Sequence, residues 1–175
     1  MLSDADMYER MQKGWRGGLS DGTVCGNSST LANTKAVRDW LPLICAKYEI
    51  QTVCDAGAGD LHWIGQVAWN VDYFPFDLIP RHRAVSKFDI TAEVLPSCDL
   101  ILCRAVLNHL DIDRIRGAVE LFRMSGQYLI ATQFSGVTKT ATAFCRLDLR
   151  PLLGKPLESI ADTCGESSEL ALWKL

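Results

Sequence analysis

The sequence predicts an α/β protein with a Rossmann-like fold, in which a mainly parallel sheet has helices on both faces and ends in a C-terminal antiparallel β-hairpin. Three observations indicate this class. Short apolar segments alternate with stretches of helical periodicity, as in parallel sheets. A glycine-rich turn directly follows the first of these segments. The length of 175 residues, without repeats or linkers, suits one domain over 1–175, with residues 1–30 as a loop-rich leading segment.

The first regular elements are predicted between residues 33 and 67. Apolar residues at helical spacing occupy 37–48 and predict a helix. Pro42 removes one backbone hydrogen bond and clashes with the preceding turn, so we expect a kink or two short helices. Residues 52–54 read as a short buried strand. A further helical stretch follows, with Leu61, Ile64 and Val67 on one side.

Three more strands are expected in the middle of the chain. Residues 72–76 predict a strand ending at Asp77, although Pro75 is awkward in a central strand. A short strand is expected to end near Phe88-Asp89. The clearest strand is 99–103, a continuous apolar run of the kind found where both faces of a strand are covered.

The C-terminal part begins with a helix and then changes character. Asp111 is a suitable N-cap for a helix over the next residues, and Gly126 suits its C-terminal stop. Residues 127–134 predict a strand. Residues 135–154 have no helical stripe and are expected to form a mobile cover on the substrate side. Residues 155–163 and 168–175 predict the antiparallel hairpin at the sheet edge.

Composition limits the function. The net charge is −3 and the pI is near 5.6, so no electrostatic footprint for nucleic acid is present and a nucleic-acid partner is unlikely on charge grounds. No apolar run approaches the roughly 20 residues needed to cross a bilayer, and residues 1–10 are too polar for a signal peptide. We therefore expect a cytoplasmic protein. The seven cysteines form no Cys-x-x-Cys pair, which argues against a metal site.

Three acidic residues stand at successive predicted strand ends. Asp55 begins the turn that contains Gly57 and Gly59, where the missing side chains let a ligand approach the backbone. Asp77 follows about 20 residues later, where a carboxylate accepts bonds from ribose hydroxyls. Asp89 comes near the end of the next strand. A glycine pair alone is also explained by a tight turn, but the spacing of the acids predicts a nucleoside cofactor.

In this order the residues resemble class I S-adenosylmethionine-dependent methyltransferases. Residues 55–59 resemble the first motif of that family, Phe76-Asp77 its ribose-binding acid, Asp89-Ile90 its adenine-contacting position and residues 99–104 its fourth-strand motif. The resemblance implies S-adenosyl-L-methionine as the cofactor. The third glycine of the first motif is absent, with Asp60 and Leu61 in its place.

The resemblance also assigns roles. It implies that Gly57 and Gly59 admit the methionine portion of the cofactor and that Asp55 holds the turn or accepts from the cofactor ammonium. It further implies that Asp77 binds the ribose and Asp89 the adenine amino group, that Ile90 flanks the ring, and that Cys103 and Arg104 line the far side with main-chain groups. Arg104 could instead pair with an anionic substrate, or with Asp99 or Asp111.

A narrower resemblance covers about residues 15–175. Residues 26–31, 59–63, 103–110 and 172–175 are similar to a group of short bacterial and phage methyltransferases of poorly defined substrate. Our leading hypothesis for the acceptor is a small molecule, or a sugar-like or peptide-like group. The sequence indicates neither the methylated atom nor the oligomeric state.

Methyl transfer from a sulfonium depends mainly on positioning, and a general base is needed only where the acceptor loses a proton. His109, just past the fourth strand, is the candidate catalytic residue, with a capping or packing role as the equal alternative. Two other functions stay open. One is a nicotinamide-dependent reductase, which His62 disfavours because it replaces the third glycine of the dinucleotide fingerprint. The other is a non-catalytic binding or partner protein.

Overall fold

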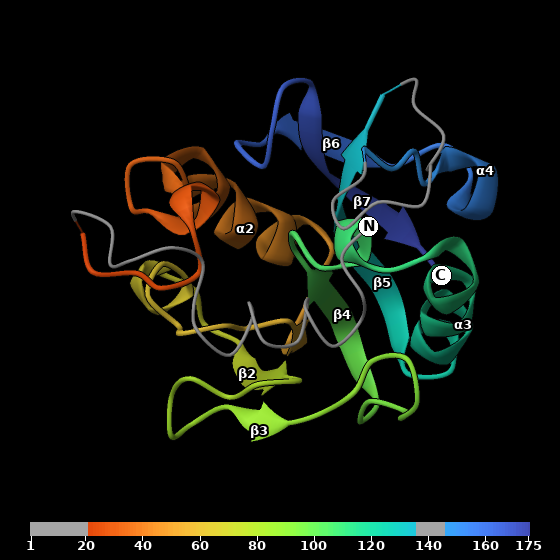
Figure 1. Ribbon diagram of the computed structural model, residues 1–175, viewed down its shortest axis with the longest axis horizontal. Coiled ribbons are helices and arrows are strands. Elements are labelled where there is room, and N and C mark those ends of the chain that lie inside the picture. The colour runs from red at the N-terminus through yellow and green to blue at the C-terminus, as the bar shows by residue number, and fades with distance from the viewer. Residues whose placement is uncertain (1–20, 136–145) are drawn as a thin grey trace.

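The computed structural model describes residues 21–135 and 146–175, and its centre is a seven-stranded sheet with the order β3-β2-β1-β4-β5-β7-β6 (Figure 1). Strands β1 to β5 pair in parallel. Strand β7 runs antiparallel to both of its neighbours, β5 and β6. The strands are β1 (Thr52–Ala56), β2 (Asp72–Asp77), β3 (Ser86–Lys87), β4 (Cys98–Cys103), β5 (Gly126–Phe134), β6 (Glu158–Ala161) and β7 (Ser168–Lys174).

This arrangement confirms the predicted fold class and the C-terminal hairpin. Because only β7 is reversed, the carboxyl ends of the other six strands and the start of β7 lie at one edge of the sheet. We call this the carboxyl edge. It is the edge at which open α/β sheets bind their ligands.

Helices cover both faces of the sheet (Figure 1). Alternate residues of β4 belong to different cores: Leu100 and Leu102 pack in the layer that includes α2 (Lys35–Lys47), whereas Ile101 and Cys103 pack in the layer that includes α3 (Ile112–Arg123). This alternation follows from the two-residue period of a strand. It explains why residues 100–103 are apolar on both sides of the strand.

Helix α2 is one helix of 13 residues with Pro42 inside it, so the proline does not divide the segment into two. The buried stripe of Val37, Leu41 and Ile44 packs against the sheet. Tertiary packing of such a face contributes most of a helix's stability in proteins and outweighs the one hydrogen bond that proline removes.

The helix predicted after β1 is wrong. Only a one-turn 3-10 helix, Ile64–Gln66, forms there. Leu61 has φ 59, a left-handed conformation that an α-helix does not contain. Ile64 and Val67 are nevertheless buried in the α2-side core. The spacing of the apolar residues therefore indicated which side chains are buried, and an irregular segment buries them as well as a helix does.

Pro75 fits β2 because of the direction of its missing N–H. Asp72 N donates to Gln51 O at 2.8 Å, and Phe76 O accepts from Gly57 N at 2.9 Å. The backbone N–H and C=O groups of the even-numbered residues of β2 therefore point toward β1. The N–H that Pro75 lacks would point the other way. On that side β3 pairs only with Phe76 and Asp77. The proline thus removes no sheet hydrogen bond, which is the position proline takes near sheet edges.

The remaining elements follow the predictions with local differences. The Asp111 carboxylate caps α3 as predicted, with Oδ1 accepting from Arg114 N at 2.8 Å. Gly126 does not stop this helix, because α3 ends at Arg123 and Gly126 already starts β5. A short helix, α4 (Arg150–Leu153), lies in the segment predicted to lack helix. Half of the predicted cover, 136–145, lies outside the described residues.

Candidate functional site

The glycine turn leaves the carboxyl end of β1 and is tied to the end of β2. Gly57 has φ 123 and Gly59 has φ 60, conformations that favour glycine. The N–H groups of Gly57 and Ala58 both donate to Phe76 O, at 2.9 and 3.0 Å. The turn is therefore a defined loop held by backbone bonds to the neighbouring strand.

Protein side chains occupy the space beside both glycines. A Cβ atom on Gly57 would lie 2.2 Å from Val106 Cγ2, and one on Gly59 would lie 2.6 Å from Cys25 Sγ. Both distances are too short for non-bonded carbon or sulfur atoms. The glycines are thus required by the packing of this chain as well as by their φ values, and the packing requirement was not visible in the sequence.

Asp77 lies directly against the glycine turn. Its Oδ2 accepts from Gly59 N and its Oδ1 from Ile79 N, each at 2.9 Å. Asp77 is half-buried. A carboxylate offers about four lone-pair sites, so these two bonds leave acceptor capacity for a ligand hydroxyl. The structure thus brings Asp77 and Gly59 together.

Asp55 is buried, not open at the turn. Its Oδ2 accepts from the Tyr73 hydroxyl at 2.6 Å. Burial raises the pKa of Asp55 to about 7, with the Asp77 charge adding to the rise and the Tyr73 hydrogen bond and the Arg104 charge opposing it. The bond to Tyr73 links β1 to β2 directly below the glycine turn.

Three other predicted site residues are placed at or near the ends of β3 and β4. Asp89 Oδ1 accepts from Thr91 N at 2.9 Å and from Thr91 Oγ1 at 2.6 Å, which starts a turn two residues after β3. Ile90 is buried in the α3-side core. Cys103 is fully buried in the same core, and burial raises the pKa of its thiol. Only main-chain groups of Cys103 are thus available to a ligand.

Arg104 pairs with a residue that sequence reasoning missed. Its Nη2 lies 2.8 Å from Asp162 Oδ1, and its Nη2 also donates to Ser28 O at 2.9 Å. The guanidinium carbon lies 5.2 Å from the centre of the Trp63 ring. The suggested pairs with Asp99 or Asp111 are wrong: Asp99 accepts from Gln51 and Thr52, and Asp111 caps α3.

His109 ends a 3-10 helix, Leu107–His109, that follows β4 at the carboxyl edge. The residue is half-buried, and its N–H donates to Val106 O at 2.9 Å. It lies only three residues from Val106, whose side chain contacts the glycine turn. The predicted base is thus on the same loop as a residue that packs against the candidate cofactor site.

Asp60 is a second residue whose role the sequence did not show. Its Oδ2 accepts from Thr23 Oγ1 and from Val24 N, both at 2.8 Å, and its Oδ1 accepts from His62 N at 3.1 Å. These bonds hold the leading segment against the glycine turn. The sequence signal for this role was the presence of Asp60 where the family's first motif continues toward its third glycine.

Several general features of the described chain bear on the chemistry. Among residues 21–135 and 146–175, no group of three or more His, Cys, Asp or Glu side chains is arranged to hold a metal ion. No helix in the same ranges has the length and apolarity to cross a membrane.

Comparison with known proteins identifies the fold. No known protein family profile matches the sequence, and no curated protein sequence matches it. Solved structures do match. The N-methyltransferase NodS from Bradyrhizobium japonicum WM9, in complex with S-adenosyl-L-homocysteine, is 14% identical, with a TM-score of 0.67 over 96% of this chain and 97% of that one. The chain has the Rossmann-like methyltransferase fold.

Two further structures extend this finding. Magnesium protoporphyrin IX methyltransferase (ChlM) from Synechocystis PCC 6803, with bound S-adenosylmethionine, is 15% identical, with a TM-score of 0.64 over 99% of this chain and 93% of that one. The Burkholderia thailandensis 1,6-didemethyltoxoflavin-N1-methyltransferase is 14% identical, with a TM-score of 0.59 over 82% and 78%. The common feature is the fold, and function must be argued from the site.

Proposed function

We propose that this protein is an S-adenosylmethionine-dependent methyltransferase whose cofactor lies along the carboxyl edge, from the glycine turn after β1 to the end of β3. The observation that carries the proposal is the 2.9 Å bond from Gly59 N to Asp77 Oδ2. It places an acid with spare acceptor capacity against a glycine turn, in a fold shared with methyltransferases solved with this cofactor or its product.

The residues fit the cofactor in a specific order. Asp77 accepts from the ribose hydroxyls, and Asp89 accepts from the adenine amino group beside Ile90. Asp55, buried and bonded to Tyr73, fixes the turn from below and does not contact the cofactor ammonium directly. Gly57 and Gly59 present backbone to the methionine portion. Cys103 and Arg104 contribute main-chain groups, since the one side chain is in the core and the other is bonded to Asp162.

When bound, the cofactor would supply a methyl group activated by its sulfonium, and the electron pair of the carbon–sulfur bond would stay on sulfur as the acceptor atom takes the methyl group. Where the acceptor carries a proton, His109 takes it at the carboxyl edge. The protein's main contribution is to hold the reactants in line, which gives large effective molarities without a reactive side chain.

We further propose that the acceptor is a small molecule, or is sugar-like or peptide-like. Two of the similar structures are named for the small molecules 1,6-didemethyltoxoflavin and magnesium protoporphyrin IX, which supports this class. His109→Gln, which keeps a hydrogen-bonding side chain without the base, should lower kcat for an acceptor that loses a proton while leaving cofactor affinity unchanged.

Titration calorimetry with S-adenosylmethionine, its demethylated product and NADPH tests the cofactor proposal. We expect binding of the first two and none of the third. Binding of NADPH alone would favour a reductase and overturn the proposal. Binding of S-adenosylmethionine with no methyl transfer to any of a panel of amine, hydroxyl and thiol acceptors would identify a non-catalytic binding protein.

A further inference from the structure

A buried ion pair joins the C-terminal hairpin to the carboxyl end of β4. Arg104 immediately follows β4 and Asp162 immediately follows β6, and their side chains are 3% and 0% exposed. Two nitrogens of Arg104 donate to the same oxygen, Asp162 Oδ1, at 2.8 and 3.2 Å. Burying both charges costs free energy of desolvation, so such a pair is better explained by the geometry it imposes than by stability.

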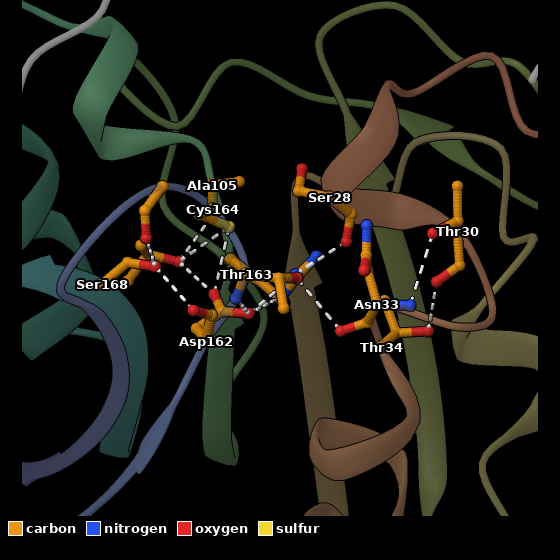
Figure 2. Close-up of polar contacts among 12 residues, drawn as sticks. Ser28, Thr30, Asn33, Thr34, Ala105, Asp162, Thr163, Cys164 and Ser168 are labelled. Atoms are coloured by element: carbon orange, nitrogen blue, oxygen red, sulfur yellow. Dashed lines mark hydrogen bonds and ion pairs between the residues drawn. The ribbon is translucent and has the colours of Figure 1, made fainter.

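The other oxygen of Asp162 connects to β5. Thr132 Oγ1 donates to Asp162 Oδ2 at 3.4 Å, and the Cys164 thiol donates to the same oxygen at 3.0 Å. Thr132 Oγ1 in turn accepts from Ala105 N at 3.0 Å. A single hydroxyl, itself buried, therefore links the hairpin acid to the backbone one residue beyond Arg104. Figure 2 labels Ala105 and Asp162, the two residues that this hydroxyl joins.

Ala105 is in a conformation that needs such support. Its φ is 58, a left-handed value that costs free energy for a residue with a Cβ atom. Strain of this kind persists where the surrounding structure determines it, and here the strained residue itself donates its N–H to Thr132 Oγ1. The next residue, Val106, is thereby directed onto Gly57, whose missing Cβ would lie 2.2 Å from Val106 Cγ2.

The hairpin also holds the leading segment that lies on Gly59. Arg104 Nη2 donates to Ser28 O at 2.9 Å, and Thr163 Oγ1 donates to Asn33 O at 3.0 Å. Figure 2 shows Asp162, Cys164 and Ser168 on one side of the view and Thr30, Asn33 and Thr34 on the other. Cys25, which fills the space beside Gly59, comes three residues before Ser28 in the chain. Both glycines of the turn are thus packed by segments that Asp162 and its partners hold.

We propose that Asp162 and Thr132 are positioning residues for the cofactor site. They hold Ala105 in its left-handed conformation and, through Val106, hold the glycine turn in the shape that the cofactor meets. Neither residue needs to touch the cofactor. The inference rests on the proposed function, because it concerns the same site.

Thr132→Val tests the proposal with little change in shape. It removes the hydroxyl that bonds Ala105 N while the ion pair of Arg104 and Asp162 stays. We expect the Kd for S-adenosylhomocysteine, measured by calorimetry well below the melting temperature, to rise about three- to tenfold, as expected for one lost hydrogen bond. Thr132→Ser keeps the hydroxyl and should keep the wild-type Kd. Asp162→Asn should also raise the Kd if it folds.

A double variant separates positioning from general stability. If the effect passes through Val106, Thr132→Val should add little to the Kd in a Val106→Ala background, because contacting residues on one path are not additive. Glu166→Gln is the matched control. It removes a carboxylate from the same hairpin, where Glu166 pairs with Arg146 at the surface, and should leave the Kd unchanged.

The outcomes distinguish this inference from the proposed function. If the wild-type protein binds neither S-adenosylmethionine nor S-adenosylhomocysteine, the cofactor assignment fails and this inference fails with it. If the wild type binds and Thr132→Val has a lower melting temperature but an unchanged Kd, the network is structural only and the positioning role is wrong, while the proposed function stands. A raised Kd that Thr132→Ser also shows would overturn the role of the hydroxyl.

Discussion

The two halves of the carboxyl edge are built in different ways. On the β1–β2 side, the glycine turn is held by backbone N–H groups and by acids no more than about 20 residues away along the chain, the usual spacing of such motifs. On the β4–β6 side, the central contact joins Arg104 to Asp162, 58 residues apart. The first half is a local motif, whereas the second is a long-range network of side chains. The comparison teaches that a motif recognisable in sequence can depend on partners that are not.

Breaking the long-range half should have the largest effect on stability. Asp162→Ala leaves the Arg104 guanidinium buried without its counter-charge, so we expect the free energy of unfolding to fall by about 3–5 kcal/mol. Chemical denaturation monitored by circular dichroism measures it. Glu166→Ala, which removes an exposed partner from the same hairpin, should cost about 0–1 kcal/mol. If both variants lost the same free energy of unfolding, burial of the Arg104–Asp162 pair would make no difference to its contribution to stability.

The local half contains a titration that the long-range half influences. The pKa of Asp55 is about 7 in the folded protein, against 3.8 for the unperturbed side chain. Between about pH 4 and pH 7 the folded state therefore holds a proton that the unfolded state has lost, and stability falls as pH rises through this window. Above about pH 7 the side chain is ionised in both states and the loss is complete.

Asp55→Asn removes this titration. From pH 4 to pH 7, the free energy of unfolding of the wild type should fall by a few kcal/mol relative to that of Asp55→Asn. Above pH 7 the difference between the two proteins should stay constant. Denaturation curves of both proteins over pH 4–8 measure it, since the other carboxyl groups are common to both. A difference independent of pH would mean that Asp55 is ionised throughout.

Cofactor affinity should depend most on Asp77 within the local half. Asp77→Ala removes the charged acceptor proposed for the ribose, and the loss of one charge-assisted hydrogen bond costs about 1.5–3 kcal/mol, so the Kd for S-adenosylhomocysteine should rise at least tenfold. Asp77 also accepts from Gly59 N. Asp77→Asn keeps one oxygen for that bond and serves as the control for the shape of the turn. Equal affinity for wild type and Asp77→Ala would exclude the assignment.

Gly57 joins the two halves, and its substitution should affect both fold and binding. A Cβ atom at this position would lie 2.2 Å from Val106 Cγ2, and the residue would have to keep a φ of 123. Gly57→Ala should therefore destabilise the protein by about 1–3 kcal/mol and weaken cofactor binding. Adding Val106→Ala removes the clash but not the strain, and should recover part of the stability. If the second substitution recovers nothing, the two residues are not in the contact described.

The sequence-based interpretation succeeded where a residue's role depends on its near neighbours. The run at 99–103 predicted β4, and Asp111 predicted the start of α3. The spacing of Asp77 from the glycines predicted one shared cofactor site, which stays a prediction, and in the structure Gly59 N donates to Asp77. The helix expected after β1 failed, because apolar spacing reports which side chains are buried and not the backbone conformation that buries them.

By itself, the sequence determined the alternation of strands and helices, the reversed hairpin and the glycine turn with its acids, because periodicity and turn chemistry are local properties. Only the tertiary structure decided which acid pairs with Arg104, why Pro75 is tolerated in β2 and what fills the space beside Gly57. Each of these depends on strand order and register, which bring Asp162, the open side of β2 and Val106 into place. Contacts between segments distant in the chain leave no periodic pattern, so they had to be seen in the folded molecule.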